Sequence, residues 1–337
     1  MSFGMMSVMP PDSAIGTPIR WGILATGSIA ESFATDLALV DGNELAAVGS
    51  RRPEAARAFG ERFGATRAHG SYEQLAADPD VDVIYVATPH SRHLEDVMMC
   101  FEAGKAVLCE KALTMNVTDA ETLVAEARSR SLFFAEAMWM RVNPNIRRIK
   151  ELATTGALGK IGQVRAELGS ATSRDIERLW NPALGASTLL DTGIYPLTFA
   201  HLILGEPVDI AAAGTLSEEG IDVNGGATMT YADGAVASIA WTQLARSDNR
   251  ASVAGDVGRI EVPPRFHQPT GFAYFHDDRW DTISEPVTGL GYAHEIAEVA
   301  SCVRAGATES ALLPLDETVS IMRQIETILG QLAVAPR

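Results

Sequence analysis

Residues 19–30 read Ile-Arg-Trp-Gly-Ile-Leu-Ala-Thr-Gly-Ser-Ile-Ala. The apolar beginning of this stretch predicts a buried strand, and small residues then lead into a helix expected over residues 28–40. Ala25, Gly27 and Ala30 occupy the three small positions of the pattern G-x-G-x-x-G/A, with alanine in place of the first glycine. The arrangement is typical of a dinucleotide-binding turn, in which Gly27 lets the backbone approach a pyrophosphate at the start of a helix. An ordinary strand–helix turn is the alternative at this point.

The composition is that of a globular protein, and its charge argues against nucleic acid and anionic membranes as partners. Its 337 residues are 47% hydrophobic and 21% charged, which is ordinary for a chain with room for two domains. The 43 acidic and 27 basic residues give a formal net charge of -16. Such a surface repels nucleic acid and anionic membranes, so we expect neither as a partner. An anionic cofactor would need local positive groups.

Cysteine usage and the N-terminus bear on the compartment. Cys100, Cys109 and Cys302 are sparse and odd in number, which favours a reduced, cytoplasmic protein with three small core residues rather than reactive thiols. Residues 1–18 lack the basic start and the apolar run of a signal peptide, so we expect a disordered leader there. No stretch is long and apolar enough to predict a membrane span.

Strands and helices alternate through the first part of the chain. The expected strands are 19–24, 45–49, 83–87, 106–109 and 132–135. The expected helices are 28–40, 53–63, a short one opened by a capping box at 71–74, 93–103, and one opened by a second capping box at 118–121 and ending at Arg128. This alternation predicts an α/β fold, a Rossmann dinucleotide-binding domain over residues 19–140 with a parallel sheet covered on both faces.

The pattern changes over residues 141–337. A helix at 143–153 and a turn at 156–162 precede strand-like runs at 163–168, 210–216, 227–231, 236–241, 251–254 and 259–262. Short polar turns such as Ala232-Asp233-Gly234 indicate hairpins. Helices at 292–304 and 315–332 close the chain, where they can pack back on the first domain. We therefore expect a C-terminal α+β domain with an open, mostly antiparallel sheet for substrate binding and dimerisation.

The end of the second strand suggests which cofactor binds. An NAD enzyme would carry an acidic residue there for the ribose hydroxyls, but this chain has Ser50-Arg51-Arg52. Guanidinium groups bind phosphate bidentately and the serine hydroxyl adds a donor, so the segment favours the 2′-phosphate of NADP. A solvated helix start is the alternative, and NAD remains a second candidate. The turn contributes the other predicted cofactor residues of this region: Ala25, Thr26, Gly27, Ser28 and Ile29.

Two more groups of residues follow strands of the predicted sheet. Thr88, Pro89, His90 and His93 leave the strand at 83–87, and Glu110-Lys111 follows the strand at 106–109. Ligands of open α/β sheets bind outside the carboxyl ends of the strands, so we expect all of these residues to face the cofactor. The two histidines have no third ligand at a convincing spacing, so we predict no metal, and ordinary hydrogen bonding within the loop explains them better than metal binding. A lysine at such a place can hold a substrate hydroxyl and assist proton transfer, although most lysines are simply exposed.

Asp191 and Tyr195 lie four residues apart in the second domain and would share one face of a helix. Tyr195 could exchange a proton and Asp191 could orient a hydroxyl. From spacing alone, a buried tyrosine with a satisfied hydroxyl and a surface carboxylate explain the pair better.

Together these segments resemble the glucose-fructose oxidoreductase and inositol dehydrogenase family (Gfo/Idh/MocA) over nearly the whole chain after the leader. The resemblance rests on the order and spacing of the turn at 25–30, Ala-Thr-Pro-His at 87–90, Glu110-Lys111, the cluster at 156–162 and Asp191-x-Gly193-x-Tyr195. Within the family, residues 136–141 and Tyr195 look most like the branch of dimeric dihydrodiol dehydrogenase and NADP-dependent D-xylose dehydrogenase.

The resemblance implies an NADP-dependent oxidoreductase that transfers hydride to or from a small polyhydroxylated substrate, an aldose such as D-xylose or a trans-dihydrodiol. It implies that Lys111 and Tyr195 flank the substrate hydroxyl with Asp191 nearby. Tyr195 would be the general acid/base, and Lys111 would lower its pKa. Trp139 and Arg141 would lie at the substrate pocket. A homodimer formed through the open sheet of the second domain is also implied.

One departure concerns Ala112, which stands where the family usually has a proline preceded by a cis bond. A cis bond before alanine costs about 3 kcal/mol, so we predict a trans bond between Lys111 and Ala112. Two rival functions stay open: a non-catalytic sensor that binds NADP, and internal redox chemistry with a retained cofactor.

Overall fold

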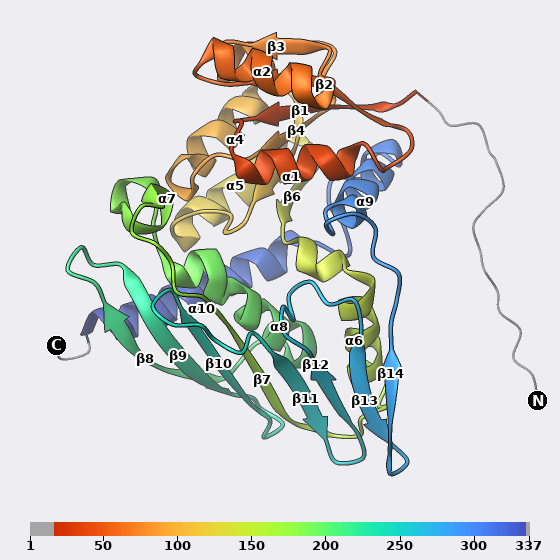
Figure 1. Cartoon of the computed structure of the whole chain (residues 1–337), viewed down its shortest axis with the longest axis vertical. Coiled ribbons are helices and arrows are strands. Elements are labelled where there is room, and N and C mark those ends of the chain that lie inside the picture. The colour runs from red at the N-terminus through yellow and green to blue at the C-terminus, as the bar shows by residue number, and fades with distance from the viewer. Residues whose placement is uncertain (1–16, 335–337) are drawn as a thin grey trace, which may run out of the picture.

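The computed structural model describes residues 17–334, so nearly all of the leader expected over residues 1–18 lies outside the described residues. The N-terminal domain is a parallel six-stranded sheet in the order β3-β2-β1-β4-β5-β6. Its strands are β1 (Ile19–Leu24), β2 (Asn43–Gly49), β3 (Arg67–His69), β4 (Val83–Val86), β5 (Ala106–Glu110) and β6 (Phe134–Ala137). Its helices are α1 (Ser28–Leu37), α2 (Pro53–Phe63), α3 (Tyr72–Ala76), α4 (His93–Glu102) and α5 (Val117–Arg130). The predicted Rossmann fold is confirmed (Figure 1).

Burial explains the sheet and places its crevice. Every residue of β4 is buried, as a central parallel strand covered on both faces requires. The strand order reverses between β1 and β4, because β1 pairs with β2 on one side and with β4 on the other. Ligands of doubly wound sheets bind at this switch point, beyond the carboxyl ends of the strands.

Helix α5 begins earlier than the sequence suggested. The capping box predicted at Thr118 is wrong, because Asn116 caps the helix instead. The Asn116 side chain accepts a hydrogen bond from the backbone N–H of Asp119 at 2.9 Å and donates one to the Asp119 carboxylate at 2.8 Å. Asparagine is as good an N-cap as threonine or better, so the reciprocal pair forms two residues upstream.

The C-terminal domain holds a mixed eight-stranded sheet in the order β14-β13-β12-β11-β7-β10-β9-β8. Neighbouring strands are antiparallel except β7 and β10, which confirms the mostly antiparallel prediction. The strands are β7 (Ile161–Gly169), β8 (Asp209–Leu216), β9 (Asp222–Thr230), β10 (Val236–Thr242), β11 (Ala251–Gly255), β12 (Arg259–Val262), β13 (Phe272–His276) and β14 (Arg279–Ile283). The helices of this half are α6 (Pro144–Thr154), α7 (Glu177–Trp180), α8 (Ile194–Leu204), α9 (Ala293–Arg304) and α10 (Leu315–Val334).

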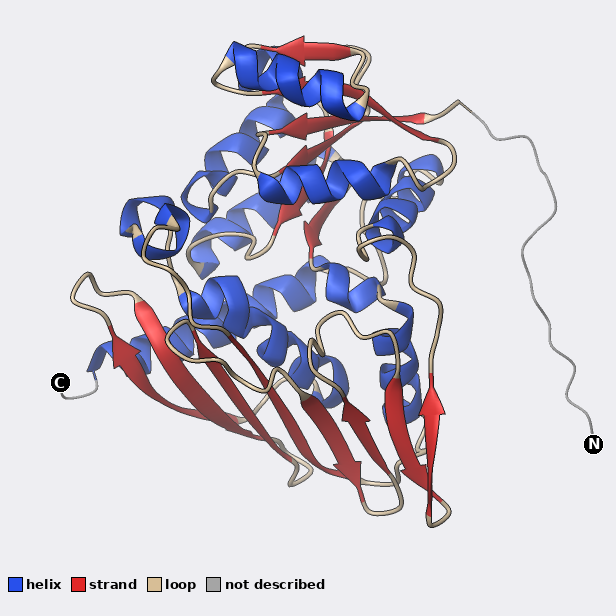
Figure 2. Cartoon of the chain, in the orientation of Figure 1, coloured by secondary structure: helices blue, strands red, loops and turns tan. Residues whose placement is uncertain are grey.

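Helices cover one face of the large sheet and join the two domains. Helix α8 packs on β7 and β10, and α10 packs on β8, as Figure 1 shows. Helix α10 also contacts α5, and α9 contacts α1, so the last helices of the chain lie against the first domain. In Figure 2 no helix of the described chain lies on the opposite face of the large sheet. Within residues 17–334, no helix combines the length and apolar character needed to cross a membrane.

Candidate active site

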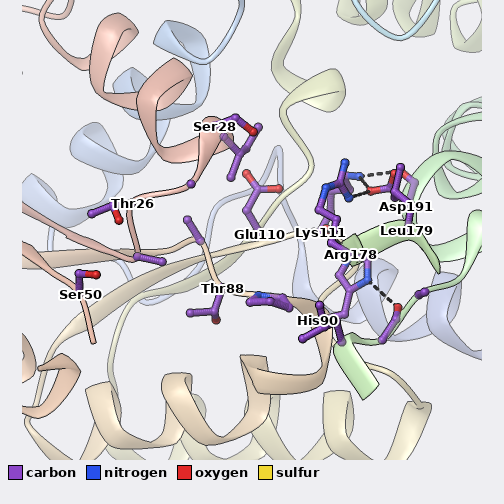
Figure 3. Close-up of a pocket in the computed structure, with 18 of the residues that line it drawn as sticks. Thr26, Ser28, Ser50, Thr88, His90, Glu110, Lys111, Arg178, Leu179 and Asp191 are labelled. Carbon is purple, nitrogen blue, oxygen red and sulfur yellow. Dashed lines mark hydrogen bonds and ion pairs between the residues drawn. The ribbon is translucent and has the colours of Figure 1, made fainter. Parts of the chain in front are cut away.

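A pocket of about 670 Å³ lies where the switch point of the Rossmann sheet meets a segment of the second domain. Figure 3 shows part of its lining. Of the residues predicted to bind the cofactor, all but His93 line this pocket: Ala25, Thr26, Gly27, Ser28, Ile29, Ser50, Arg51, Arg52, Thr88, Pro89, His90, Glu110 and Lys111. Asp191 and Tyr195 line it from the second domain. The structure therefore brings the separate strand-end motifs into one site.

The turn at 25–30 has the geometry that a pyrophosphate needs. Ala25 adopts a φ of 86°, the left-handed conformation for which glycine is the usual residue. Its N–H donates to the Gly49 carbonyl at 3.0 Å, which ties the turn to the end of β2. Gly27 is the N-cap of α1, so no side chain of the N-cap residue occupies the first N–H groups of the helix. The space beside its Cα is open, because a Cβ added there would meet nothing within 4 Å. The first N–H groups of α1 are thus accessible to an anion.

The end of β2 presents positive charge to the same pocket. Arg51 and Arg52 are exposed, and neither forms an ion pair within the described part of the chain, whereas nearby Arg62 binds Glu31. The Ser50 hydroxyl accepts a hydrogen bond from the Arg52 N–H at 3.3 Å. Across the pocket, the buried Thr88 hydroxyl has no partner among the described residues. An open helix start, two exposed guanidinium groups outside any ion pair of the described residues and an unpartnered hydroxyl fit a phosphorylated dinucleotide such as NAD(P).

The two histidines of the loop after β4 hold the pocket wall together. The His90 ring lies within 3.2 Å of the Gly185 carbonyl and 3.1 Å of the Lys111 carbonyl, so it joins the two domains. Burial lowers the pKa of His90 to about 4. His93 is fully buried, and its ring contacts the carbonyls of Thr88, Ala112 and Leu113. The prediction that His93 faces the cofactor is therefore wrong, because these backbone contacts draw it away from the pocket.

The peptide bond between Lys111 and Ala112 is cis, so the predicted trans bond is wrong. Local preference gives way here to tertiary contacts on both sides of the bond. The carbonyls of Lys111 and Ala112 each meet a histidine ring, and the N–H of Leu113 donates to the buried Glu136 carboxylate at 3.0 Å. Lys111 nevertheless points into the pocket, as its predicted role requires.

A carboxylate between two cations marks one end of the pocket. The Lys111 ammonium donates to the Asp191 carbonyl at 2.6 Å and lies 3.4 Å from its carboxylate, and Arg178 donates to the same carboxylate at 2.9 Å (Figure 3). Burial acts to raise the pKa of Asp191, but the charges of Lys111 and Arg178 outweigh it and hold that pKa well below its usual range. Asp191 is therefore a permanent acceptor beside Lys111.

Tyr195 lies beside this group, and its hydroxyl already accepts one hydrogen bond. The Trp139 indole N–H donates to the Tyr195 hydroxyl at 2.8 Å, and the Lys111 ammonium lies 5.0 Å from the centre of the Tyr195 ring. Burial, helped by the charge of Glu110, raises the pKa of Tyr195 well above its usual value, while the Trp139 hydrogen bond acts in the opposite direction. The lowered pKa implied by the resemblance is thus not found, because burial dominates.

Two predicted substrate residues do not line the pocket. Trp139 is buried behind Tyr195 and stacks on Tyr292 with 5.0 Å between ring centres. Arg141 is buried at the domain junction and forms an ion pair with Glu317 of α10. The direct substrate contact predicted for Arg141 is wrong, because its guanidinium is used to join α10 to the segment after β6.

Several lining residues were not predicted from the sequence. They are Tyr72, Ala87, Arg178, Leu179, Leu184, Gly185, Ala186 and Ser187. Most belong to the stretch that contains the four-residue helix α7, which is too short to show a helical period. Among residues 17–334, no group of three or more His, Cys, Asp or Glu side chains could hold a metal ion.

Comparison with known proteins agrees with this architecture. Residues 19–137 match the oxidoreductase family with an NAD-binding Rossmann fold, and residues 146–261 match the GFO/IDH/MocA C-terminal domain. Trans-1,2-dihydrobenzene-1,2-diol dehydrogenase of Bos taurus is 33% identical over 93% of this chain and 97% of its own length. The enzyme of that name from Mus musculus is 34% identical over 91% of this chain and 95% of its own length.

Solved structures show the same fold. KijD10, a 3-ketoreductase from Actinomadura kijaniata solved with NADP and TDP-benzene, superposes with a TM-score of 0.84 at 26% identity, over 94% of this chain and 98% of that one. An aldose-aldose oxidoreductase from Caulobacter crescentus superposes with a TM-score of 0.85 at 23% identity, over 93% of this chain and 97% of that one. At this identity the similarity supports the fold alone.

Fold and site define an NAD(P)-dependent oxidoreductase that acts on alcohol groups. The chain belongs to the Gfo/Idh/MocA oxidoreductase family.

Proposed function

We propose that this protein is an NADP-dependent dehydrogenase whose substrate is a small polyhydroxylated compound, a trans-dihydrodiol or an aldose such as D-xylose. The observation that carries the proposal is the convergence of Lys111, Asp191 and Tyr195 on one pocket with the dinucleotide-binding turn. The similar enzymes named for a dihydrodiol support the first substrate class. The second rests on the resemblance drawn from the sequence.

The cofactor preference rests on the end of β2. Arg51 and Arg52 would hold the 2′-phosphate with Ser50, and no carboxylate follows the strand to bind a free ribose hydroxyl. The start of α1 would hold the pyrophosphate. When bound, the cofactor supplies a nicotinamide ring that accepts or donates hydride.

The residues of the second domain would handle the proton. Tyr195 accepts a hydrogen bond from Trp139, so its own proton is free to be donated to a substrate oxygen. The raised pKa keeps the phenol protonated, which suits proton donation during reduction of a carbonyl group. Lys111 would hold the same oxygen, and Asp191 would accept from a neighbouring hydroxyl. In the oxidation direction the deprotonated form of Tyr195 would accept the proton of the substrate hydroxyl, so oxidation first requires loss of the phenol proton to the solvent.

A spectrophotometric screen tests this function. The protein is mixed with NADP or NAD and with a panel of dihydrodiols, aldoses and inositols, and the absorbance of the reduced nicotinamide is followed. We expect turnover of a diol or an aldose, faster with NADP at limiting cofactor concentration. A cofactor that co-purifies and never exchanges would favour internal redox instead, and exchangeable NADP binding without turnover would favour the sensor.

A further inference from the structure

One buried carboxyl group lines the pocket, a second lies close to the first, and neither takes part in the mechanism above. Glu110, at the end of β5, lines the pocket with 7% of its surface exposed, and the Tyr85 hydroxyl donates a hydrogen bond to its Oε1. Glu295 of α9 is 0% exposed, and neither of its carboxyl oxygens has a partner among the described residues. Burying a carboxylate without a partner is very costly, so Glu295 must carry a proton.

Burial disfavours the charge of Glu110, and Lys111 and the Tyr85 hydroxyl offset it only in part. The ionisable groups around it are Tyr85 of β4, Cys109 and Lys111 of its own segment, Asp191, Tyr195 of α8, and Tyr292 and Glu295 of α9, with Asp36 of α1 next to Glu295. The cation of this set, Lys111, is already bound to Asp191. Burial raises the pKa of Glu110 to about 7, and burial with the charge of Glu110 raises that of Glu295 well above its usual value.

We propose that Glu110 loses a proton when the oxidised cofactor binds and keeps it when the reduced cofactor binds, so that this residue distinguishes the two redox states. The inference rests on the proposed function. Glu110 lies between Ser28 and Lys111 in Figure 3, at the end of the pocket where hydride transfer is proposed. The oxidised nicotinamide ring carries a positive charge that the reduced ring lacks, and a nearby cation favours a carboxylate. The carboxyl O–H of Glu110 then breaks and its proton passes to the solvent.

Calorimetry can count this proton. NADP⁺ and NADPH are titrated into the protein at pH 7 in phosphate and in Tris, whose ionisation enthalpies differ. We expect roughly half a proton more to be released with NADP⁺ than with NADPH, because a group with a pKa near the working pH is half protonated. The 2′-phosphate is common to both cofactors, so its own ionisation cancels from the difference.

Matched variants assign the proton to one carboxyl group. Glu110→Gln should abolish the difference and weaken NADP⁺ relative to NADPH by about tenfold at pH 8, the equivalent of one unit in pKa. Glu295→Gln should leave the difference intact, because Glu295 is protonated in every state. A difference that survives in Glu110→Gln, or that disappears in Glu295→Gln, overturns the inference.

A milder variant covers the case in which Glu110→Gln fails to fold. Tyr85→Phe removes only the hydroxyl that donates to Glu110, so the proton release should persist but move to higher pH. Release that stays at the same pH in Tyr85→Phe contradicts the assignment to Glu110. If the unmodified protein binds neither cofactor, the proposed NADP site is refuted. That result differs from one in which both cofactors bind but Glu110 releases no proton, which refutes only the inference.

Discussion

We propose that Tyr195 and Lys111 decide whether the pocket performs chemistry or only binds a dinucleotide. We expect Tyr195→Phe and Lys111→Ala each to reduce turnover at least about a hundredfold, because each removes a group that holds or moves the substrate proton. Binding of NADP, measured by fluorescence titration, should survive, because the turn and the arginines are untouched. Near-normal turnover in both variants would refute their assigned roles.

We expect Trp139 to act on the reaction through the hydroxyl of Tyr195. Trp139→Phe keeps an aromatic ring against Tyr292 but removes the N–H that donates to the Tyr195 hydroxyl. That hydrogen bond favours the phenolate, so its loss should raise the pKa of Tyr195 further. In the direction of carbonyl reduction, where Tyr195 donates the proton, the basic limb of the pH profile of kcat should move to higher pH. Tyr292→Phe is the control and should leave the limb in place; an unmoved limb in Trp139→Phe contradicts this coupling.

Arg51 should determine the choice between the two nicotinamide cofactors. Arg51→Ala is expected to weaken NADP binding by about thirtyfold, the effect of losing one charge-assisted contact with phosphate, and NAD binding by only a fewfold. Arg62→Ala provides the control, because Arg62 lies in the same domain but pairs with Glu31 outside the pocket. Equal weakening of both cofactors would show that Arg51 does not read the phosphate.

The sequence predicted which residues line the pocket where a strand end dictated their position. The turn at 25–29, the segment at 50–52 and Lys111 all follow strands of one parallel sheet, and such ends meet at one edge. Arg178 was missed because its contact with Asp191 depends on the path of an irregular segment. The cis bond after Lys111 was missed for a related reason, since long-range contacts rather than the local dipeptide hold it.

At the scale of elements, Asp36 links α1 to the start of α9. Its fully buried carboxylate accepts hydrogen bonds from the N–H groups of Leu290, Tyr292 and Ala293 at 2.9 to 3.1 Å. Asp36→Ala would leave these donors buried without partners, so we expect a loss of about 3 kcal/mol in the free energy of unfolding. Urea denaturation measures it.

The same helix provides the control for Asp36. Thr35 is exposed, so Thr35→Ala should change the free energy of unfolding by less than about 0.5 kcal/mol. A loss in Asp36→Ala no larger than in Thr35→Ala would show that the Asp36 contacts contribute nothing to stability.

The elements that sequence reasoning missed lacked the patterns on which it depends. Helix α8 is buried nearly all round, so its residues show no polar face and no helical period. The hairpin of β13 and β14 turns at Asp277 and Asp278, both with positive φ, where Asn-Gly would have been the usual signal. Helix α2, which has one polar face, was predicted at its observed bounds, whereas β6 begins and ends two residues later than the predicted 132–135.

At the scale of the molecule, the active site exists because the chain crosses between its domains more than once. The Rossmann sheet and the residue after it supply Glu110 and Lys111, the second domain supplies Asp191 and Tyr195, and α9 returns to pack against α1 of the first domain. A division of the chain at residue 140 describes the two sheets, but the pocket and the buried carboxyl group of Glu295 belong to the joint between them. Separate expression of either half would therefore not yield this site.

The exposed face of the large sheet leads to a proposal about assembly. In β10, Ala237 and Ile239 are buried under the helices while Ser238 between them is exposed, and Ser238 lies opposite Thr228 of β9 and Arg165 of β7. We propose that two copies pair through this face, as the resemblance to the Gfo/Idh/MocA family implies. A twofold interface is formed by the same face of both copies. Cations added to that face therefore meet the cations added to the partner and repel them.

A double variant tests this assembly. Thr228→Arg with Ser238→Arg places two new cations side by side on the exposed face, and we expect the mass measured by sedimentation to fall from that of a dimer to that of a monomer. Asp233→Arg is the control, because Asp233 lies exposed in the turn between β9 and β10, at the edge of the sheet, and should leave the mass unchanged. Thermal unfolding separates dissociation from misfolding, since the helix-covered face that forms the core is not altered. If the unmodified chain sediments as a monomer, or the double variant keeps the mass of a dimer, this face is not the interface.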